Sequence, residues 1–170
     1  MKKATLAFVV LSVVSLATDA ALAGDPEPQK PLFVLERNRN KNFVRYDAKV
    51  TSDGAIDAKE PVVAYWIMAE EDGRKEPLSA IERALAYGFS AQPDKKGNVW
   101  LTLTAHKSKS IRVFKDDSGV HAETGIAGKR AYLSKLFVMA GPEFIPKVTY
   151  LDLFGVDAKT GAPLQERLTP

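Results

Sequence analysis

From residue 32 onward, the chain alternates short segments rich in β-branched and aromatic residues with clusters of turn-forming residues. The clusters recur at residues 38–42, 52–54, 95–97, 117–119 and 158–161, and each contains asparagine or glycine. Such an alternation is typical of antiparallel hairpins, because Gly and Asn adopt the backbone angles of tight turns. The sequence therefore predicts a mainly β protein: an antiparallel meander of about eight to ten strands, closed as a small β-barrel or folded as a sandwich.

Three segments indicate how this sheet would be buried. Residues 43–50 alternate apolar and charged side chains, as in a strand with one face in the core. Residues 61–69 are apolar on both faces, which indicates a central strand covered on two sides. Residues 77–86 carry apolar side chains at three- and four-residue spacing, so we predict one inserted α-helix there.

The first 23 residues have the three parts of a secretory signal peptide. Two lysines supply a positive start, residues 4–18 carry no charge, and Ala21 and Ala23 form a small-residue cleavage site. The uncharged segment is shorter than the roughly 20 apolar residues that a membrane-spanning helix needs. We therefore expect residues 1–23 to be removed and the protein to be periplasmic or secreted in a bacterium, with no integral membrane segment after cleavage.

Two further ranges complete the predicted organisation. Residues 24–31 hold three prolines among charged residues, which favours an extended, flexible lead-in. Residues 32–170 then form a single β-rich domain, since their length is within the usual range for one domain.

Composition excludes several classes of function. The chain has no cysteine, which excludes disulfides, cysteine-based zinc sites and thiol nucleophiles. Its 24 Lys and Arg residues are nearly balanced by 21 Asp and Glu residues, leaving a formal charge of +3. So small a surplus, spread along the chain, is not the basic stripe of a nucleic-acid-binding protein, and we expect no nucleic-acid partner.

Three short motifs are similar to functional sites, but each lacks a required residue. Residues 49–60 place carboxylates at several EF-hand positions, yet Lys49 occupies the first ligand position. Residues 88–92 approach a nucleophile elbow but end in Gln92 rather than glycine. Residues 125–130 lack the spacing and the Ser or Thr of a phosphate loop. We therefore expect no metal and no cofactor, and we assign no catalytic residue.

Two groups of side chains remain as candidates for ligand binding. The first is a charged hairpin tip whose guanidinium groups suit carboxylate, phosphate or sulfate: Glu36, Arg37, Arg39 and Arg45. The second could line a barrel cavity with apolar bodies and polar tips: Tyr46, Tyr65, Trp66, Trp100 and Tyr150. His106 ends a strand, and Asp152 lies in an apolar strand, where a carboxylate must point outward or be paired. The alternatives are a solvated tip, a solvent-exposed His106 and aromatic residues that simply pack the core.

Parts of the chain resemble a known family. The segments LFVLERNRNKNFVRYD (residues 32–47), PVVAYWI (61–67) and YLDLFG (150–155) resemble an uncharacterised exported bacterial family, domain of unknown function 4833. Its most specific part is the Glu-Arg-Asn tip followed by Asn40 and Asn42. The resemblance extends over residues 32–170 and implies a small exported β-rich domain, without an activity, cofactor or catalytic residue to carry over.

These observations favour a non-enzymatic exported β-barrel that binds an apolar or anionic small molecule or a lipid-like ligand. One alternative is a cell-envelope module that binds a protein or glycan through its sheet edge or basic tip, and a filled core would favour it. Another is a hydrolase that uses carboxylates such as Asp152 or Glu36, although no acid, base or nucleophile stands out.

Overall fold

The computed structural model describes residues 29–142 and 147–169. The predicted signal peptide, residues 1–23, lies outside the described residues, as do residues 24–28. The elements in chain order are β1 (Gln29–Arg37), β2 (Phe43–Lys49), β3 (Val62–Ile67), β4 (Lys75–Pro77), α1 (Ala80–Glu82), the π-helical turn η1 (Arg83–Tyr87), β5 (Phe89–Pro93), β6 (Val99–Leu103), β7 (His106–Asp116), β8 (Gly119–Ile126), β9 (Lys129–Ala140), β10 (Val148–Asp157) and β11 (Pro163–Leu168).

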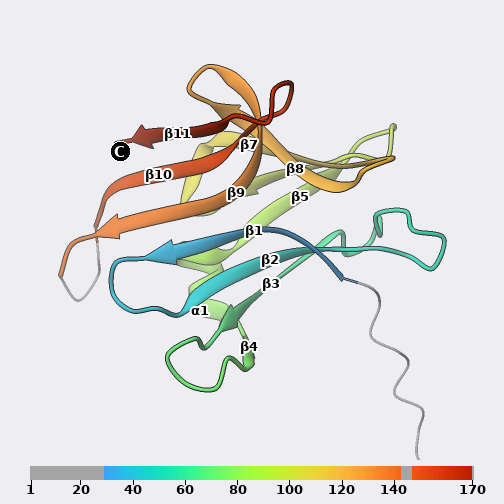
Figure 1. The fold of residues 1–170 in the computed structure, drawn as a ribbon. Helices are drawn as coiled ribbons and strands as arrows, with labels where there is room; N and C mark the ends of the chain where they lie inside the picture. The colour runs from blue at the N-terminus through green and yellow to red at the C-terminus, as the bar shows by residue number, and fades with distance from the viewer. Residues whose placement is uncertain (1–28, 143–146, 170) are drawn as a thin grey trace, which may run out of the picture.

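The strands form one 11-stranded sheet that curls into a half-barrel (Figure 1). Neighbouring strands follow the order β4-β3-β2-β1-β9-β8-β7-β6-β5, and β10 and β11 extend the sheet from the other side of β9. The mainly β class and the single inserted helical segment are therefore confirmed. β1 begins at Gln29 and pairs there with Lys49 of β2, so the end of the predicted flexible lead-in belongs to a strand.

Strand β9 connects the two halves of the sheet. Its first residues pair with β8, its residues 135–138 pair with β1, and its opposite edge pairs with β10 along most of its length. The β1–β9 pair is parallel, which differs from the expected antiparallel meander. Hairpin patterns predict pairing only between strands adjacent in the chain, so they do not reveal this long-range pair.

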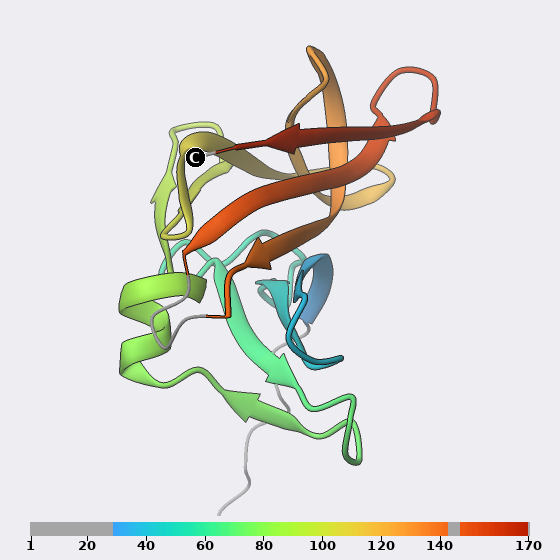
Figure 2. The same ribbon diagram turned by 90° about the vertical axis from the view of Figure 1, so that its left-hand side faces the viewer.

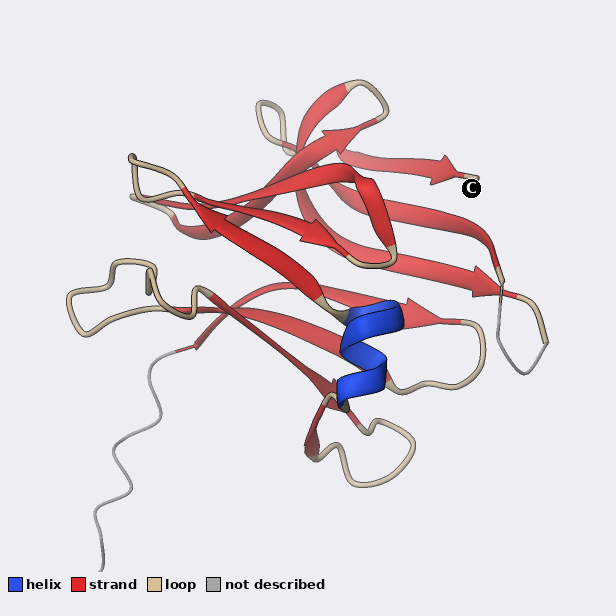
Figure 3. Cartoon of the chain, turned by 180° about the vertical axis from the view of Figure 1, so that it is seen from behind, coloured by secondary structure: helices blue, strands red, loops and turns tan. Residues whose placement is uncertain are grey.

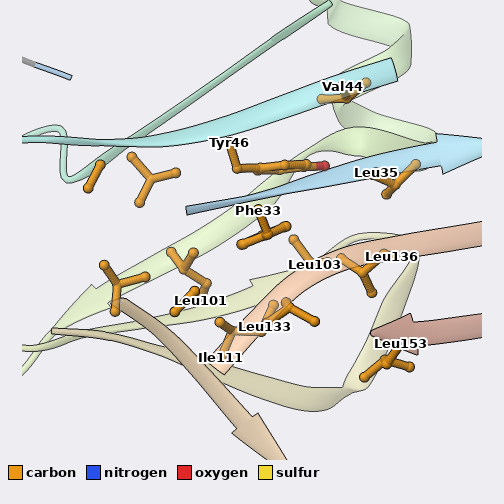
Figure 4. Close-up of a cluster of buried hydrophobic side chains, with 14 of the residues drawn as sticks. Phe33, Leu35, Val44, Tyr46, Leu101, Leu103, Ile111, Leu133, Leu136 and Leu153 are labelled. Atoms are coloured by element: carbon orange, nitrogen blue, oxygen red, sulfur yellow. The ribbon is translucent and has the colours of Figure 1, made fainter. Parts of the chain in front are cut away.

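Side chains from both halves fill the inner face of the sheet. Tyr46 stacks on Phe33 with 4.6 Å between ring centroids. Aliphatic side chains from six strands pack around these rings (Figure 4): Leu35, Val44, Leu101, Leu103, Ile111, Leu133, Leu136 and Leu153. Because this packed core occupies the inside of the half-barrel, candidate ligand sites are the hollows at its surface.

The helical segment lies at one end of the half-barrel, just before β5 (Figures 2 and 3). It begins with a capping box, in which the Ser79 side chain accepts the Glu82 N–H and the Glu82 carboxylate accepts the Ser79 N–H. The predicted helix is thus confirmed near residues 77–86, although its second turn is π-helical. Ile81 and Leu85 are 71% and 74% exposed, so its apolar spacing does not mark a face buried in the core.

Candidate functional site

Beside the helical segment, residues from β1, β3 and β4 and from the adjoining loops surround an open hollow of about 420 Å³. We call it the Arg37 pocket. Its lining residues are Arg37, Asn40, Asn42, Trp66, Met68, Glu76, Pro77, Ser79 and Glu82. Two of the residues proposed from the sequence, Arg37 and Trp66, therefore meet in one site.

Arg37 is held in place by three neighbours. Its guanidinium carbon lies 4.6 Å from the centroid of the Trp66 ring, a cation–π contact. Its Nη1 donates to the Tyr87 hydroxyl at 3.0 Å, and its Nε donates to Oδ1 of Asn40 at 3.4 Å. Within residues 29–142 and 147–169, no carboxylate forms an ion pair with Arg37. These neutral contacts orient the guanidinium, and none of them neutralises its charge.

Glu82 forms a second wall of the pocket. Its Oε1 accepts the Trp66 Nε1–H at 3.0 Å, and its Oε2 accepts the Ser79 N–H and hydroxyl, each at 2.8 Å. Burial raises the pKa of Glu82, but these hydrogen bonds and the nearby Arg37 charge lower it to a net value below the usual one. Glu82 is therefore an ionised acceptor that fixes Trp66 beneath Arg37, not a proton donor for catalysis.

Neighbouring residues of the predicted hairpin tip do not join Arg37. Adjacent strand residues point to opposite faces, so Glu36 lies on the outer face of the sheet. Lys135 pairs with it there, with 3.1 Å between Nζ and Oε2. Arg39 is exposed in the loop after β1 and donates to the Gly141 carbonyl at 3.3 Å. The structure thus separates the charged groups that the sequence places side by side.

Arg45 and Tyr65 meet on the outer face around a buried carboxylate. Asp47 is 1% exposed, and it accepts the Arg45 Nε–H at 2.7 Å and the Tyr65 hydroxyl at 2.5 Å. Burial and the hydrogen bond to Asp47 raise the pKa of Tyr65 to about 12, so its hydroxyl remains a donor. Both carboxylate oxygens have partners, which indicates a structural role for this group.

Tyr150 and Asp152 lie on the outer face of β10 next to Arg167. The guanidinium donates two hydrogen bonds of 2.7 Å to Asp152, and its carbon lies 3.7 Å from the Tyr150 ring centroid. Asp152 is 4% exposed and paired, which satisfies the requirement for a carboxylate in an apolar strand. The hydrogen bonds and charge of Arg167 lower the pKa of Asp152.

The last two predicted residues lie apart from the Arg37 pocket. Trp100 is 44% exposed on the outer face of β6, and its Nε1 donates to Asp94 at 3.4 Å. His106 borders a small apolar hollow of about 140 Å³ together with Ala105, Val138, Val148, Leu151, Leu168 and Thr169. Partial burial and the nearby Lys109 charge lower the pKa of His106, so its ring is neutral at pH 7.

Of the residues that line the pocket, the sequence-based candidates include only Arg37 and Trp66. Glu82, which lines the pocket, and Tyr87, which holds Arg37, are among the residues they miss. Ser79 followed by Glu82 is the signature of a capping box, so the sequence did contain a signal for Glu82. Tyr87 carried no comparable signal, since it lies 50 positions from Arg37 in the chain. Arg37 and Tyr87 come together only because β1 packs against the helical segment.

The described residues show neither a metal-ligand cluster nor a membrane-spanning helix. Residues 29–142 and 147–169 contain no group of three or more His, Asp or Glu side chains arranged to hold a metal ion. In the same ranges, no helix has the length and apolar character required to cross a membrane.

Comparison with known proteins yields one match. A family model described as Domain of unknown function (DUF4833) matches residues 33–167. No curated protein and no solved structure matches the chain. The matched range begins in β1 and ends in β11, so it includes every residue that lines the Arg37 pocket.

Proposed function

The chain belongs to the DUF4833 family, a domain of unknown function, and from that premise we propose that it is an exported, non-enzymatic binding protein. Its ligand is a small molecule with a carboxylate, sulfate or phosphate group, bound in the Arg37 pocket. The observation that carries this proposal is the Arg37 guanidinium, which is oriented by Trp66 and Tyr87 yet has no ion-pair partner within the described residues.

The surroundings of Arg37 support binding of this kind. A guanidinium that is already oriented loses little conformational entropy when a ligand arrives, which favours affinity. Within the described residues, the side chains of Asn40 and Asn42 form hydrogen bonds only through their oxygens. Their amide NH₂ groups can therefore donate to further oxygens of the ligand.

The ligand class can be tested by NMR titration with benzoate, phenyl sulfate and phenyl phosphate as probes. The chain has two tryptophans, so each indole N–H gives a separate signal. We expect a saturable shift of the Trp66 signal, because its indole lies beneath Arg37. Trp100 on the outer face serves as a control within the same molecule, and its signal should not move.

Two variants make this test specific. Arg37→Gln should weaken binding of the responding probe by about 10- to 100-fold, the effect expected for charge-assisted hydrogen bonds. Arg39→Gln removes a neighbouring charge outside the pocket and should leave the affinity unchanged. If no probe saturates, or if Arg37→Gln binds as well as the wild type, the proposed anion site is wrong.

Export is a separate part of the proposal and rests on residues 1–23, which carry the signal-peptide pattern. The test is to express the full chain in a bacterium, recover the periplasmic fraction and measure the intact mass. We expect a chain that begins at Gly24. A full-length chain confined to the cytoplasm would contradict export without affecting the proposed ligand site.

A further inference from the structure

Two strand edges of the half-barrel border the same hollow without a strand between them. Among the described strands, β5 pairs only with β6, and β4 pairs with β3 at residues 65–67 but not at residues 62–64. Residues 62–64 of β3 and the start of β5 line a common hollow of about 270 Å³, which we call the seam. The helical segment lies at one end of this opening (Figure 3).

Backbone hydrogen bonds show which groups of β5 point into the seam. The Thr104 N–H donates to the Gly88 carbonyl at 2.9 Å. In an antiparallel ladder, hydrogen bonding to one neighbour alternates along the strand. Since Gly88 faces β6, the backbone N–H and C=O groups of Phe89 and Ala91 face the free edge.

The same reasoning applies to β3. The Lys49 N–H donates to the Pro61 carbonyl at 3.0 Å, so Pro61 faces β2. Val62 and Ala64 therefore direct their backbone groups away from β2 and toward the seam. Both borders of the seam thus present main-chain donors and acceptors that no strand of the described chain pairs.

Neither border has the usual protection against strand addition. Natural edge strands are blunted by charged side chains, prolines or bulges. Residues 62–64 are Val-Val-Ala and residues 89–92 are Phe-Ser-Ala-Gln, so both edges lack charge. Pro93 interrupts β5 only at its last position.

Arg83 provides a charge at the helical end of the seam. It lines the hollow, and its Nε donates to the Leu78 carbonyl at 3.2 Å. Across residues 29–142 and 147–169, no carboxylate forms an ion pair with Arg83. Glu60, which also lines the seam, is paired with Lys49 at 2.7 Å. The available charge in the seam is therefore positive and favours an anionic group on the occupant.

We propose that the seam binds an extended peptide segment of a partner protein, which adds a strand to the free edge of β5. The peptide main chain bonds to Phe89 and Ala91, and an acidic side chain or the terminal carboxylate of the peptide lies on Arg83. The seam shares no lining residue with the Arg37 pocket. Peptide addition therefore holds or fails independently of small-molecule binding.

The test starts from a random library of peptides about eight residues long, the length of an ordinary strand. Peptides selected on the purified protein would be synthesised, and their affinities measured by fluorescence polarisation. We expect selected peptides to combine β-branched residues with an acidic group near one end. Hydrogen exchange of the Phe89 and Ala91 amides should slow when such a peptide binds. Failure to select any peptide, or slowed exchange elsewhere with none at β5, would overturn the proposal.

Three variants locate the interaction. Ala91→Pro removes an edge N–H that bonds no strand, so the fold should tolerate it while affinity falls by about tenfold or more. Ser90→Ala is the control at the neighbouring position, because it leaves every backbone N–H of β5 in place, and it should bind normally. Arg83→Gln should weaken acidic peptides by about tenfold, which keeps the test decisive if Ala91→Pro fails to fold. Unchanged affinity in Arg83→Gln, or dimerisation that Ala91→Pro abolishes, would contradict the proposed acidic partner peptide.

Discussion

In the part of the chain that the structure describes, buried side-chain polar groups have hydrogen-bond partners, with Nε of Arg112 as the exception. The Tyr46 hydroxyl shows this most clearly, because the residue is 0% exposed and lies in the middle of the core. It donates to the Tyr87 carbonyl at 2.8 Å, at the end of the helical segment. Burial raises the pKa of Tyr46 far above its usual value, so the hydroxyl remains a donor. One hydrogen bond thereby ties β2 to the helical segment that borders the Arg37 pocket.

We expect Tyr46→Phe to lower the free energy of unfolding by about 1–2 kcal/mol, because the Tyr87 carbonyl loses its donor while the ring packing on Phe33 remains. Urea denaturation of the two proteins measures this difference. Tyr132→Phe is the control: its half-buried ring stacks on His121 with 4.7 Å between ring centroids, and its hydroxyl forms no hydrogen bond with the described residues. Equal losses in the two variants would contradict the structural role of the Tyr46 hydroxyl.

At the scale of elements, the β8–β9 hairpin contains an unusual turn. Ala127 and Gly128 have φ values of 51° and 74°, and a two-residue hairpin loop with both φ positive is a type I′ turn. Alanine is disfavoured there because its Cβ crowds the backbone. Glu166 of β11 stabilises the turn, since its Oε2 accepts the Ala127 N–H at 3.1 Å.

Ala127→Gly should therefore raise the free energy of unfolding by roughly 1 kcal/mol, because glycine relieves the strain of the left-handed conformation. Thermal denaturation of both proteins would show the gain as a higher midpoint. Ala162→Gly is a control for which the opposite shift of the midpoint is expected. Ala162 does not have positive φ, so glycine there only adds flexibility to the unfolded chain and lowers the midpoint. A lower midpoint for Ala127→Gly would show that the turn is not strained in solution.

The attachment of strand β11 to the rest of the sheet depends on ion pairs as well as on strand pairing. Besides pairing with β10, the strand is held by two ion pairs, Lys109–Glu166 at 2.6 Å and Arg167–Asp152 at 2.7 Å. The hydrogen bond from Lys109 lowers the pKa of Glu166, and the hydrogen bonds from Arg167 lower that of Asp152. Both pairs require ionised carboxylates.

Acidification should therefore loosen β11. Because both pKa values are lowered by folding, the pairs stabilise the strand fully above the ordinary values of 4.5 and 3.8, and this stabilisation is lost as the pH falls through the lowered values. Hydrogen exchange, corrected for its intrinsic pH dependence, should accelerate in β11 before it does in β6. The double variant Glu166→Gln and Asp152→Asn should lose this selective response. If β11 still responds to acid in the double variant, groups other than Glu166 and Asp152 cause the response.

At the scale of the whole molecule, β10 approaches β9 closely at Gly155. A Cβ at Gly155 would lie 2.3 Å from the Tyr132 carbonyl oxygen and 2.9 Å from Cδ1 of Ile126. The register of the β9–β10 pair shifts at this point, between Phe154 and Gly155. Only glycine fits here, because any side chain would push β10 away from β9, the strand that connects the two halves of the sheet.

We expect Gly155→Ala to destabilise the fold by roughly 1–3 kcal/mol through overpacking. Gly125→Ala is a matched control, because Gly125 also lies in a strand but a Cβ there meets nothing within 4 Å. Guanidinium denaturation of both variants measures the contrast. If the two changes have the same effect, the close approach at Gly155 does not limit the stability of the half-barrel.

The sequence by itself determined the local elements of this protein. The strands, the hairpin turns and the site of the helical segment depend on residues a few positions apart, and their patterns predicted a mainly β fold with one inserted helix. The sequence grouped Glu36 and Arg37 in one hairpin tip, whereas β1 extends to Arg37 and places the two side chains on opposite faces. Which of these sides faces the core depends on the strands that cover it, and the pattern of β1 alone did not decide this.

Only the tertiary structure decided which distant segments meet. The parallel β1–β9 pair, the contact of Arg37 with Tyr87 and the open seam between β3 and β5 all join residues far apart in the chain. Such contacts form because one buried arrangement of the core is more stable than its competitors, and no short pattern encodes that comparison. The candidate sites therefore arise where the packed elements meet, whereas the elements themselves arise from local sequence.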